Sequence, residues 1–479
     1  MLFYVYHIKQ GDTLSSTLFN LYINDLPDIF KFENNNPVSV GNITISCLKY
    51  ADDLIIMSTS PLSLQKCLNN LENYCTKWKL KVNLKKTKIM IFNKQGSLIK
   101  KHKFIYNGNI VQNTKEYKYL GFTFSCSGLD NLGISKLNSQ AKKAWYAIRQ
   151  YLSKSMNKNL QTYLHLFDSQ VKPIMLYACE AWAESIKQND NISNLLRTNV
   201  LEKFHISVLK QLLGVHKKTT NISLLLETGR QPITSYAHQQ AIKYFLRMPT
   251  TTDNSLMKIY YENEKGIPPR DTFIKYIANK LDKMGMTNIW TEQLNEEKYF
   301  LKDSKFLSEI KTRMTDISSQ SILEHLNTES RKLTFLSQNK KTHHFELYLH
   351  INNFQHRRAI TKIRTSSHKL EIETGRWNNT NKNERICKNC ALNEIEDEIH
   401  FIFECRMHVA ERNELFKILK TEFNLDLSKY TTHEEKMNQI FCSDDLAMLN
   451  AFGKFVQNGL NKRENMSCYV QPPEYVLYR

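Results

Sequence analysis

The sequence predicts an α+β unit over residues 1–125, followed by a chain that is mainly helical. Short runs rich in β-branched and aromatic residues, such as Ile43–Leu48, alternate with two helical patterns in the first unit. Beyond it the strand signal fades, and apolar residues recur at helical spacing instead, as between Leu196 and Leu212. A group of cysteines and a histidine within Cys387–Cys405 then predicts a small module that binds a metal.

Length and charge narrow the classes of protein that the sequence allows. A chain of 479 residues suggests two to four domains, and its 66 lysines and arginines against 47 acidic residues leave a formal charge of +19. Such a charge favours a polyanionic partner, either nucleic acid or an acidic membrane surface. No run approaches the roughly 18 apolar residues that a membrane-spanning helix requires, and the opening apolar stretch is too short for a secretory signal. We therefore expect an intracellular protein that binds nucleic acid and no membrane.

The predicted α+β unit begins with a helix, because apolar residues recur at helical spacing over Leu14–Phe30. The stretch Ile43–Met57 then has the pattern of a strand, a tight turn and a second strand. Ser60-Pro61 suits the start of another helix, whose apolar face runs from Leu64 to Trp78. Further strands are predicted at Lys88–Phe92 and Phe104–Gln112, with a hairpin turn at Asn107-Gly108.

Two adjacent carboxylates, Asp52 and Asp53, lie at the first predicted turn. Neighbouring carboxylates repel each other unless cations offset their charge, and a divalent metal is the usual partner. In a two-metal site such acids hold Mg²⁺ ions about 3.5–4 Å apart at the attacking and leaving oxygens of a phosphoryl transfer. An exposed turn explains the pair equally well, since aspartate is common in turns for hydrogen-bonding reasons alone.

The context of the acid pair closely resembles the palm of reverse transcriptases from non-LTR (LINE-type) retrotransposons. The resemblance rests on Gln10–Ser16, Leu18–Leu26 and Tyr50–Asp53, which match the family's motifs in order and spacing. Downstream, Leu80–Lys88 looks like the family's next motif, and Tyr117–Gly121 looks like its primer-grip hairpin. The resemblance continues through Leu166–Tyr177, Leu212–Lys218 and Glu227–Pro232 and reaches roughly Gly453.

The resemblance implies an RNA-directed DNA polymerase, a nucleotidyltransferase whose palm holds two Mg²⁺ ions. Asp52 and Asp53 would be ligands of these ions, and Lys86 would lie near the triphosphate. Lys86 could donate a proton to the departing pyrophosphate, although a solvated lysine in a basic run is an equally good explanation. The implied binding residues are Gln10, Gly11, Asp12, Tyr50 and Ala51 for template and nucleotide, and Tyr119, Leu120 and Gly121 for the primer grip.

The sequence departs from the family pattern in two ways. Thr13 and Ser16 stand where the family usually has proline. In the family, an essential aspartate and the fingers precede the Gln10-Gly11-Asp12 motif, whereas here the residues before Gln10 include no acid. We therefore expect a partial palm that does not polymerise by itself. The alternative is a non-enzymatic remnant that only binds nucleic acid.

The cysteine–histidine cluster predicts a structural zinc site. Cys387, Cys390, His400 and Cys405 supply three thiolates and one imidazole, which is a full tetrahedral set, and His408 is a substitute ligand. No open coordination position is implied, so the metal would organise the fold. The other reading is a group of reduced cysteines without a metal.

Two basic stretches could contact a nucleic-acid backbone. Ten lysines and no acid lie between Lys77 and Lys103. Nearby aromatics are either stacking partners or core residues, and for Trp78 the apolar stripe favours the core. The aromatics are Trp78, Phe92, Trp145 and Tyr146, and a second, weaker basic patch comprises His356, Arg357, Arg358, Lys362 and Arg364.

The expected organisation has five parts. They are a partial palm over 1–125, a helical thumb-like region over 126–245, a helical connection over 246–375, a zinc knuckle over 376–410 and a helical tail over 411–479. The resemblance implies an RNA template, a DNA primer or target and deoxynucleotides as partners, and action in the nucleus.

Overall fold

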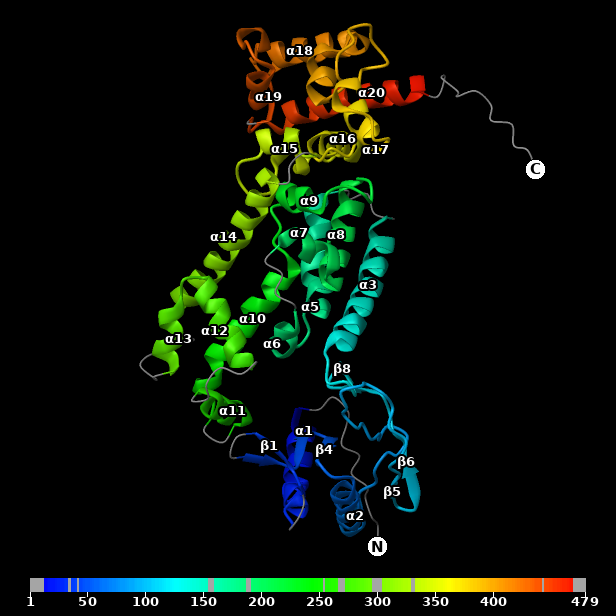
Figure 1. Ribbon diagram of the computed structural model, residues 1–479, viewed down its shortest axis with the longest axis vertical. Coiled ribbons are helices and arrows are strands. Elements are labelled where there is room, and N and C mark those ends of the chain that lie inside the picture. The colour runs from blue at the N-terminus through cyan, green and yellow to red at the C-terminus, as the bar shows by residue number, and fades with distance from the viewer. Residues whose placement is uncertain are drawn as a thin grey trace, which may run out of the picture. The chain divides into compact units, whose positions relative to one another are not determined.

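The structure is a computed structural model that describes residues 13–32, 36–40, 43–153, 159–186, 191–252, 255–265, 272–294, 304–328, 332–441 and 443–467 (Figure 1). The chain divides into two compact units. Unit 1 comprises residues 1–136 and 241–307, and unit 2 comprises residues 137–240 and 308–479. None of the helices within the described ranges combines the length and the apolar character that crossing a membrane would require.

The N-terminal part of unit 1 is α+β, as the sequence predicts. Its strands form four antiparallel pairs within the described residues, each closed by its own hairpin. The elements are α1 (Thr13–Tyr22), a 3₁₀ turn (Leu26–Phe30), β1 (Val38–Val40), β2 (Ile43–Ile45), β3 (Cys47–Tyr50), β4 (Asp53–Ile56), α2 (Pro61–Lys77), β5 (Phe104–Tyr106), β6 (Asn109–Val111), β7 (Glu116–Tyr119) and β8 (Phe122–Ser125).

Two predicted elements differ in the structure. The first helix ends at Tyr22, and a separate 3₁₀ turn with Pro27 in its first turn follows over Leu26–Phe30. The strand predicted over Lys88–Phe92 is only an isolated bridge between Ile89 and Asn113. The hairpin at Asn107-Gly108 is confirmed, with both residues at positive φ.

Helix α2 forms the centre of the core of this α+β part. Its buried face, including Leu68, Leu71 and Tyr74, packs with Phe30 of the 3₁₀ turn and Phe104 of β5. The Tyr74 hydroxyl donates a hydrogen bond of 2.5 Å to Asp25, and burial together with this carboxylate raises the pKa of Tyr74. Trp78 packs against the same core, as its place on the apolar stripe predicts. Unit 1 is completed by α11 (Leu256–Lys265), α12 (Phe273–Lys283) and α13 (Thr287–Leu294).

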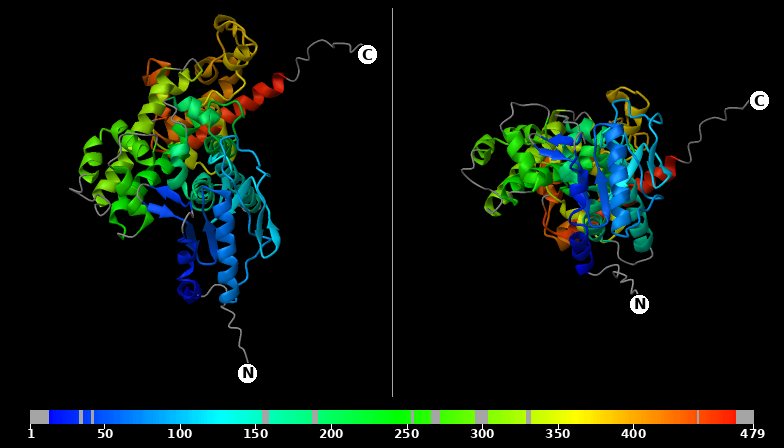
Figure 2. Two further views of the ribbon diagram at one scale, coloured as in Figure 1. Left: turned by 60° about the horizontal axis from the view of Figure 1, so that its bottom comes forward. Right: turned by 90° about the horizontal axis from the view of Figure 1, so that it is seen from below.

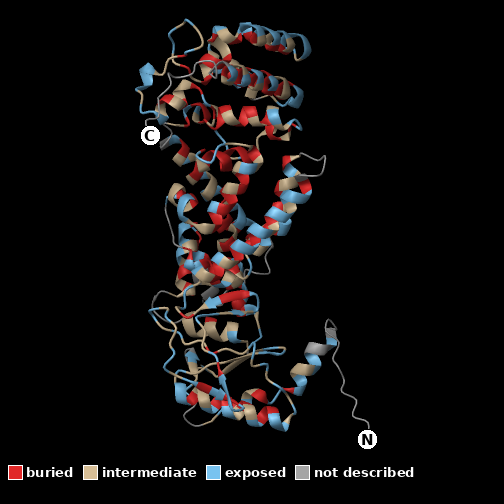
Figure 3. Ribbon diagram, turned by 90° about the vertical axis from the view of Figure 1, so that its right-hand side faces the viewer, coloured by how far each residue is buried: buried red, intermediate tan, exposed pale blue. Residues whose placement is uncertain are grey.

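Unit 2 is mainly helical over its described residues, as the helical spacing of apolar residues in the sequence predicts. One apolar cluster extends from Leu160 to Leu460, so residues far apart in the sequence share a core. Figure 3 shows the buried residues along the inner faces of these helices. The α-helices described wholly or mainly in unit 2 are α3 (Asn131–Ser153), α4 (Leu160–Leu166), α5 (Lys172–Met175), α6 (Cys179–Trp182), α7 (Ile192–Thr198), α8 (Val200–Leu213), α9 (Asn221–Thr228), α10 (Ile233–Arg247), α14 (Ser304–Thr328), α15 (Thr334–Asn339), α16 (Phe354–Arg364), α17 (Glu371–Trp377), α18 (Val409–Glu422), α19 (His433–Phe441) and α20 (Leu446–Ser467).

Helix α20 is the long partner of several C-terminal elements. It packs along α16 and also contacts α18 and α19, and it is seen as one continuous red helix in both views of Figure 2. Helix α8 shows how local sequence sets the ends of these helices. Asn199 caps its first turn by accepting hydrogen bonds from Leu201 and Glu202, and Gly214 ends it at a φ of 66°.

A buried ion network joins three segments of unit 2. The Arg364 guanidinium donates two hydrogen bonds, of 2.6 and 2.9 Å, to the carboxylate of Glu227, and the Tyr348 hydroxyl donates a third at 2.6 Å. Arg364 also lies 3.2 Å from Glu346, which pairs with Lys340. Because buried charges are costly unless paired and hydrogen-bonded, this network fixes the relative positions of α9, α16 and the segment 340–348.

Candidate functional site

The β3–β4 hairpin presents the predicted acid pair at its tip. Tyr50 pairs with Asp53 across the hairpin, so Ala51 and Asp52 form the turn. Both aspartates are exposed, and Tyr50 is 64% exposed. On the opposite end of the strands, Cys47 and Ile56 pack against the core. The hairpin is therefore anchored at its base and open to solvent at its acidic tip.

The turn of this hairpin requires an uncommon backbone conformation. Ala51 has a φ of 50°, where a Cβ atom crowds the following carbonyl oxygen and costs roughly 1–2 kcal/mol. Strained residues of this kind gather at functional sites, where the surrounding structure holds them in place. Here the four-residue ladder from Cys47–Ile56 to Tyr50–Asp53 supplies that support.

The β7–β8 hairpin carries the predicted primer-grip residues at its turn. Tyr119 pairs with Phe122, and Leu120 and Gly121 form a two-residue turn with φ values of 43° and 87°. Burial raises the pKa of the Tyr119 hydroxyl, and the negative charge of Asp53 raises it further. The structure therefore places Tyr119 within electrostatic reach of the acid pair, although the two hairpins are distant in sequence.

Lys86 is not brought to the acid pair. It lies in an exposed turn in which its backbone N–H donates to the carbonyl oxygen of Asn83 at 3.1 Å and to the side-chain oxygen at 3.3 Å. Within the described residues, no hydrogen bond or ion pair joins the Lys86 ammonium to Asp52 or Asp53. Its role beside a triphosphate stays a prediction. Gln10, Gly11 and Asp12 lie outside the described residues.

The aromatic candidates for stacking divide into two classes. Trp78 packs on the core of unit 1, and Trp145 is completely buried in unit 2. Phe92 and Tyr146 are exposed by 61% and 53%, respectively. Only this second pair offers a ring face to a ligand.

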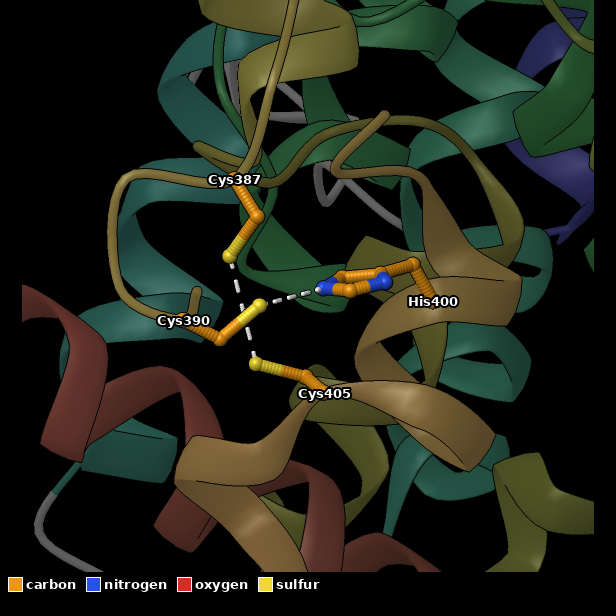
Figure 4. A group of neighbouring side chains, drawn as sticks. All are labelled: Cys387, Cys390, His400 and Cys405. Carbon is orange, nitrogen blue, oxygen red and sulfur yellow. Dashed lines mark hydrogen bonds between the residues drawn. The ribbon is translucent and has the colours of Figure 1, made fainter. Parts of the chain in front are cut away.

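The predicted metal ligands do converge in unit 2 (Figure 4). The ligand atoms of Cys387, Cys390, His400 and Cys405 all lie within 4.8 Å of one another. The sulfur atoms of Cys387 and Cys405 are 3.9 Å apart, and Cys390 Sγ lies 3.4 Å from His400 Nε2. Tetrahedral Zn²⁺ with bonds of about 2.3 Å to sulfur and about 2.0 Å to nitrogen requires separations of about 3.8 and 3.5 Å. The arrangement fits a zinc ion.

Local backbone structure explains how the four ligands meet. An isolated bridge between Ile386 and Ile395 closes the loop that carries Cys387 and Cys390. A single π-helical turn over His400–Glu404 then reverses the chain, and the Cys405 N–H donates to the His400 carbonyl at 2.7 Å. Each half of the site is therefore set by a tight local structure.

The surroundings of His400 also suit a metal ligand. Its Nδ1 lies 3.2 Å from Glu394 and 3.4 Å from Glu404, on the side of the ring away from the cysteines. A carboxylate at this nitrogen orients the ring and increases its basicity toward a metal. Burial opposes the charged form, but the neighbouring cysteines outweigh it and raise the pKa of His400 to about 9. The sequence analysis did not single out these glutamates, although Glu404 follows His400 at helical spacing.

His408, the predicted substitute ligand, lies outside this cluster. It packs edge-on against Phe401 at 4.8 Å, and burial lowers its pKa to about 4. It does not belong to any group of ligand atoms that the described residues bring together. The prediction of a substitute ligand is therefore not supported by the geometry.

The second basic patch is partly wrong as predicted. Arg364 is buried in the ion network with Glu227, and Arg357 is buried while donating to the carbonyl of Ile351. Arg358 and Lys362, in contrast, are partly exposed. Arg357 and Arg364 lie seven residues apart, about two helical turns, so both face the core. Arg358 and Lys362 lie four residues apart on another face of α16.

The N-terminal quarter of the chain is similar to a known protein family. Residues 3–124 match the reverse transcriptase (RNA-dependent DNA polymerase) family, and this segment contains both hairpins of the site. This segment is therefore similar to RNA-dependent DNA polymerases.

The similar proteins are polymerases of non-LTR retrotransposons. The RNA-directed DNA polymerase from mobile element jockey of Drosophila melanogaster is 23% identical over 205 residues, which cover 41% of this chain and 21% of that protein. The probable RNA-directed DNA polymerase from transposon BS of the same species is 24% identical over 40% of this chain and 22% of its own length. A retrovirus-related Pol polyprotein from a type-2 retrotransposable element is 30% identical over 25% of this chain and 12% of its length, also in Drosophila melanogaster. The chain thus spans about a fifth of the length of the first two relatives.

Proposed function

We propose that this chain carries the carboxylate hairpin of an RNA-directed DNA polymerase from a non-LTR retrotransposon. One observation carries the proposal: within the segment that matches the reverse transcriptase family, Asp52 and Asp53 stand exposed at a hairpin tip, and the charge of Asp53 raises the pKa of Tyr119 in the β7–β8 hairpin. The proposed substrates are deoxynucleotides, an RNA template and a DNA primer or target. The proposed site of action is the nucleus.

The proposed roles follow from the exposure and chemistry of each residue. Asp52 and Asp53 would hold Mg²⁺, which when bound offsets the charge that develops on phosphate oxygens. Tyr50 offers an exposed ring to the nucleotide or primer end, and Ala51 leaves the turn narrow enough for close approach. Tyr119 would contact the primer beside the metal ligands. The remaining proposed contacts are Leu120 and Gly121 with the primer, Lys86 with the triphosphate, and Gln10, Gly11 and Asp12 with the template and nucleotide.

The metal part of this proposal can be tested without turnover. Fe²⁺ replaces Mg²⁺ at carboxylate sites, and with ascorbate and peroxide it generates radicals that cut the nearby backbone. We expect cleavage near Tyr50–Asp53 that Mg²⁺ suppresses by competition, and we expect the variant with Asp52→Asn and Asp53→Asn to lose it. The exposed pair Asp444 and Asp445 provides a matched control, because the same double change there should leave the cleavage intact.

The polymerase part is tested by primer extension on an RNA template with the full chain. Measurable extension would overturn the expectation that this chain does not polymerise by itself. If that extension disappears in the Asp52→Asn variant, it supports the proposed role of the carboxylate, because one metal ligand is lost. Extension that persists without both carboxylates would contradict it. Salt-dependent binding of template and primer with no extension in any Mg²⁺-loaded sample would favour the non-enzymatic alternative.

We further propose that Cys387, Cys390, His400 and Cys405 hold a structural zinc ion. The support is the match between the measured separations and a tetrahedral site, together with the two glutamates at His400 Nδ1. Removing the metal should lower the melting temperature of unit 2, because the free energy of metal binding contributes to the free energy of folding.

Cobalt substitution provides the measurement for the zinc site. Co²⁺ bound by three thiolates gives an intense charge-transfer absorption, which Cys405→Ser should weaken and shift. Cys179→Ser is the matched control, since Cys179 is a buried cysteine elsewhere in unit 2. Zinc content that is unchanged in Cys405→Ser would contradict the proposed ligand set.

A further inference from the structure

A polar groove of about 630 Å³ opens in unit 2, apart from the residues proposed for catalysis or zinc binding. Five segments build it. The loop after α8 contributes His216 and Lys217, α16 contributes Arg358 and Lys362, the loop between α16 and α17 contributes Lys369, α17 contributes Trp377, and α20 forms the remaining wall.

The groove carries an excess of positive charge. Lys217, Arg358, Lys362, Lys369 and Arg463 line it, and Glu464 is the one acidic residue among its described lining residues. Two of these cations are already paired: Arg463 donates to Glu396 at 2.6 and 2.7 Å, and Lys369 lies 3.5 Å from Glu464. Lys217, Arg358 and Lys362 are the remaining positive charges of the groove, and these are the charges that an anion would contact.

These cations oppose one another in the absence of an anion. Burial lowers the pKa of Lys362, and the charges of Arg358 and Lys369 lower it further, while Glu464 only partly compensates. A phosphate placed among them would replace mutual repulsion with attraction. The partial burial also strengthens that attraction, because water screens the charges less.

The walls of the groove are held in position by hydrogen bonds. Arg358 Nε donates to the Gly214 carbonyl at 2.7 Å, which attaches α16 to the end of α8. The His216 N–H donates to Ser367 Oγ at 3.1 Å, and the same hydroxyl is 2.7 Å from Thr219 Oγ1. The loop is therefore fixed against α16 and the residues that follow it, so little conformational entropy would be lost when a ligand binds.

One wall presents an aromatic ring to solvent. Trp377 is 52% exposed, although tryptophan has the largest apolar surface of any side chain. An exposed indole beside lysines and arginine matches the combination that binds single-stranded nucleic acid, in which phosphates meet cations and a base stacks on the ring.

We propose that this groove binds a single-stranded nucleic acid, with backbone phosphates at Arg358, Lys362 and Lys217 and an unpaired base stacked on Trp377. The site goes beyond the proposed polymerase function, because none of its residues belongs to the carboxylate and primer-grip hairpins. A base that stacks on Trp377 must be unpaired, since both of its faces are covered in a duplex.

The stacking contact is tested with the full chain and short unstructured oligonucleotides by fluorescence anisotropy. We expect Trp377→Ala to weaken binding on the order of tenfold, which is typical for loss of one stacked base. Trp377→Phe retains a ring and should remain within a few-fold of the parent protein. Equal melting temperatures of the two variants would show that the loss comes from the ring and not from unfolding.

The phosphate contacts are tested by salt dependence. Changing Lys217 and Lys362 together to alanine should reduce the slope of log K against log salt by about 1.4, since each phosphate contact with a single strand contributes about 0.7. The matched control changes Lys417 and Lys429 to alanine, which removes the same charge from exposed positions on and after α18. The control should leave the slope unchanged.

Three results would overturn the proposal. They are unchanged binding in Trp377→Ala, an equal loss of slope in the control pair, and a preference for duplex over both single strands. Parallel titrations with RNA and DNA strands of one sequence identify which strand the groove prefers. Because Asp52 lies in unit 1 and does not line the groove, binding that survives in Asp52→Asn separates failure of the polymerase proposal from failure of this one.

Discussion

At the scale of single residues, the strained turn at Ala51 makes a prediction about stability. Ala51 occupies a left-handed conformation that glycine adopts without crowding. We expect Ala51→Gly to stabilise unit 1 by about 1 kcal/mol, as measured by urea unfolding. The result is informative because most glycine substitutions destabilise a protein.

Ala147 offers the matched control for that substitution. It is exposed within α3, so Ala147→Gly should destabilise its helix by about 1 kcal/mol. If both substitutions destabilise the protein to the same extent, then Ala51 is not strained in solution.

Single residues also show how far local sequence reasoning reaches. Asp52 and Asp53 could be placed at a turn because strand alternation on both sides is a local pattern, and the ligands of the zinc cluster could be found from their spacing. The burial of Arg364 could not be predicted, because its partner Glu227 is 137 residues away in the sequence. Charge alone therefore assigned Arg364 to the surface.

At the scale of elements, the junction after α9 tolerates only glycine. Gly229 has a φ of 59°, and a Cβ at this position would lie 2.5 Å from the backbone nitrogen of Phe345. The adjacent bridge between Thr228 and Phe345 keeps the two segments together. We expect Gly229→Ala to lower the free energy of unfolding by more than about 2 kcal/mol, which thermal melting would detect.

A second glycine separates the two causes of the destabilisation expected for Gly229→Ala, which are the unfavourable backbone conformation and the steric overlap of the new Cβ. Gly285 has a φ of 68°, but a Cβ there would meet nothing within 4 Å. Gly285→Ala should therefore cost only about 1 kcal/mol, the penalty of the conformation itself. Similar melting temperatures for the two variants would mean that the segment around Phe345 moves away easily.

Element types were predicted well where the sequence pattern was long, and less well where tertiary contacts decide. The helix ending at Gly214 follows from its period and its terminal glycine. The run over Lys88–Phe92 has strand composition but finds only a bridge at Ile89, because a strand needs a partner along its length. Strand propensity alone could not supply that partner.

At the scale of the whole molecule, the buried network of Arg364 is the connection whose loss should be most damaging. Removing the guanidinium leaves the buried Glu227 without a cationic partner, while Glu346 retains Lys340. We expect Arg364→Met to destabilise unit 2 by about 3–5 kcal/mol, the range for breaking a buried ion pair. Chemical unfolding monitored by circular dichroism measures this cost.

A double variant distinguishes charge from shape. Adding Glu227→Gln to Arg364→Met removes one unpaired charge, so part of the lost stability should return. Arg313→Met is a suitable control, because Arg313 forms an exposed pair with Glu309 and should change stability by less than about 0.5 kcal/mol. No recovery in the double variant would mean that packing of the arginine side chain matters more than its charge.

The pairing of Arg463 with Glu396 has a consequence for synthesis on the ribosome. Glu396 lies beside the zinc ligands and accepts both hydrogen bonds from Arg463, which belongs to α20, the last helix described. The cysteines therefore leave the exit tunnel well before the arginine that neutralises their neighbour, and translation adds only about 5–20 residues each second. During that interval the carboxylate of Glu396 would lack its cationic partner. Early capture of zinc would protect the nascent module, so cells short of zinc should lose the newly made protein before the mature one.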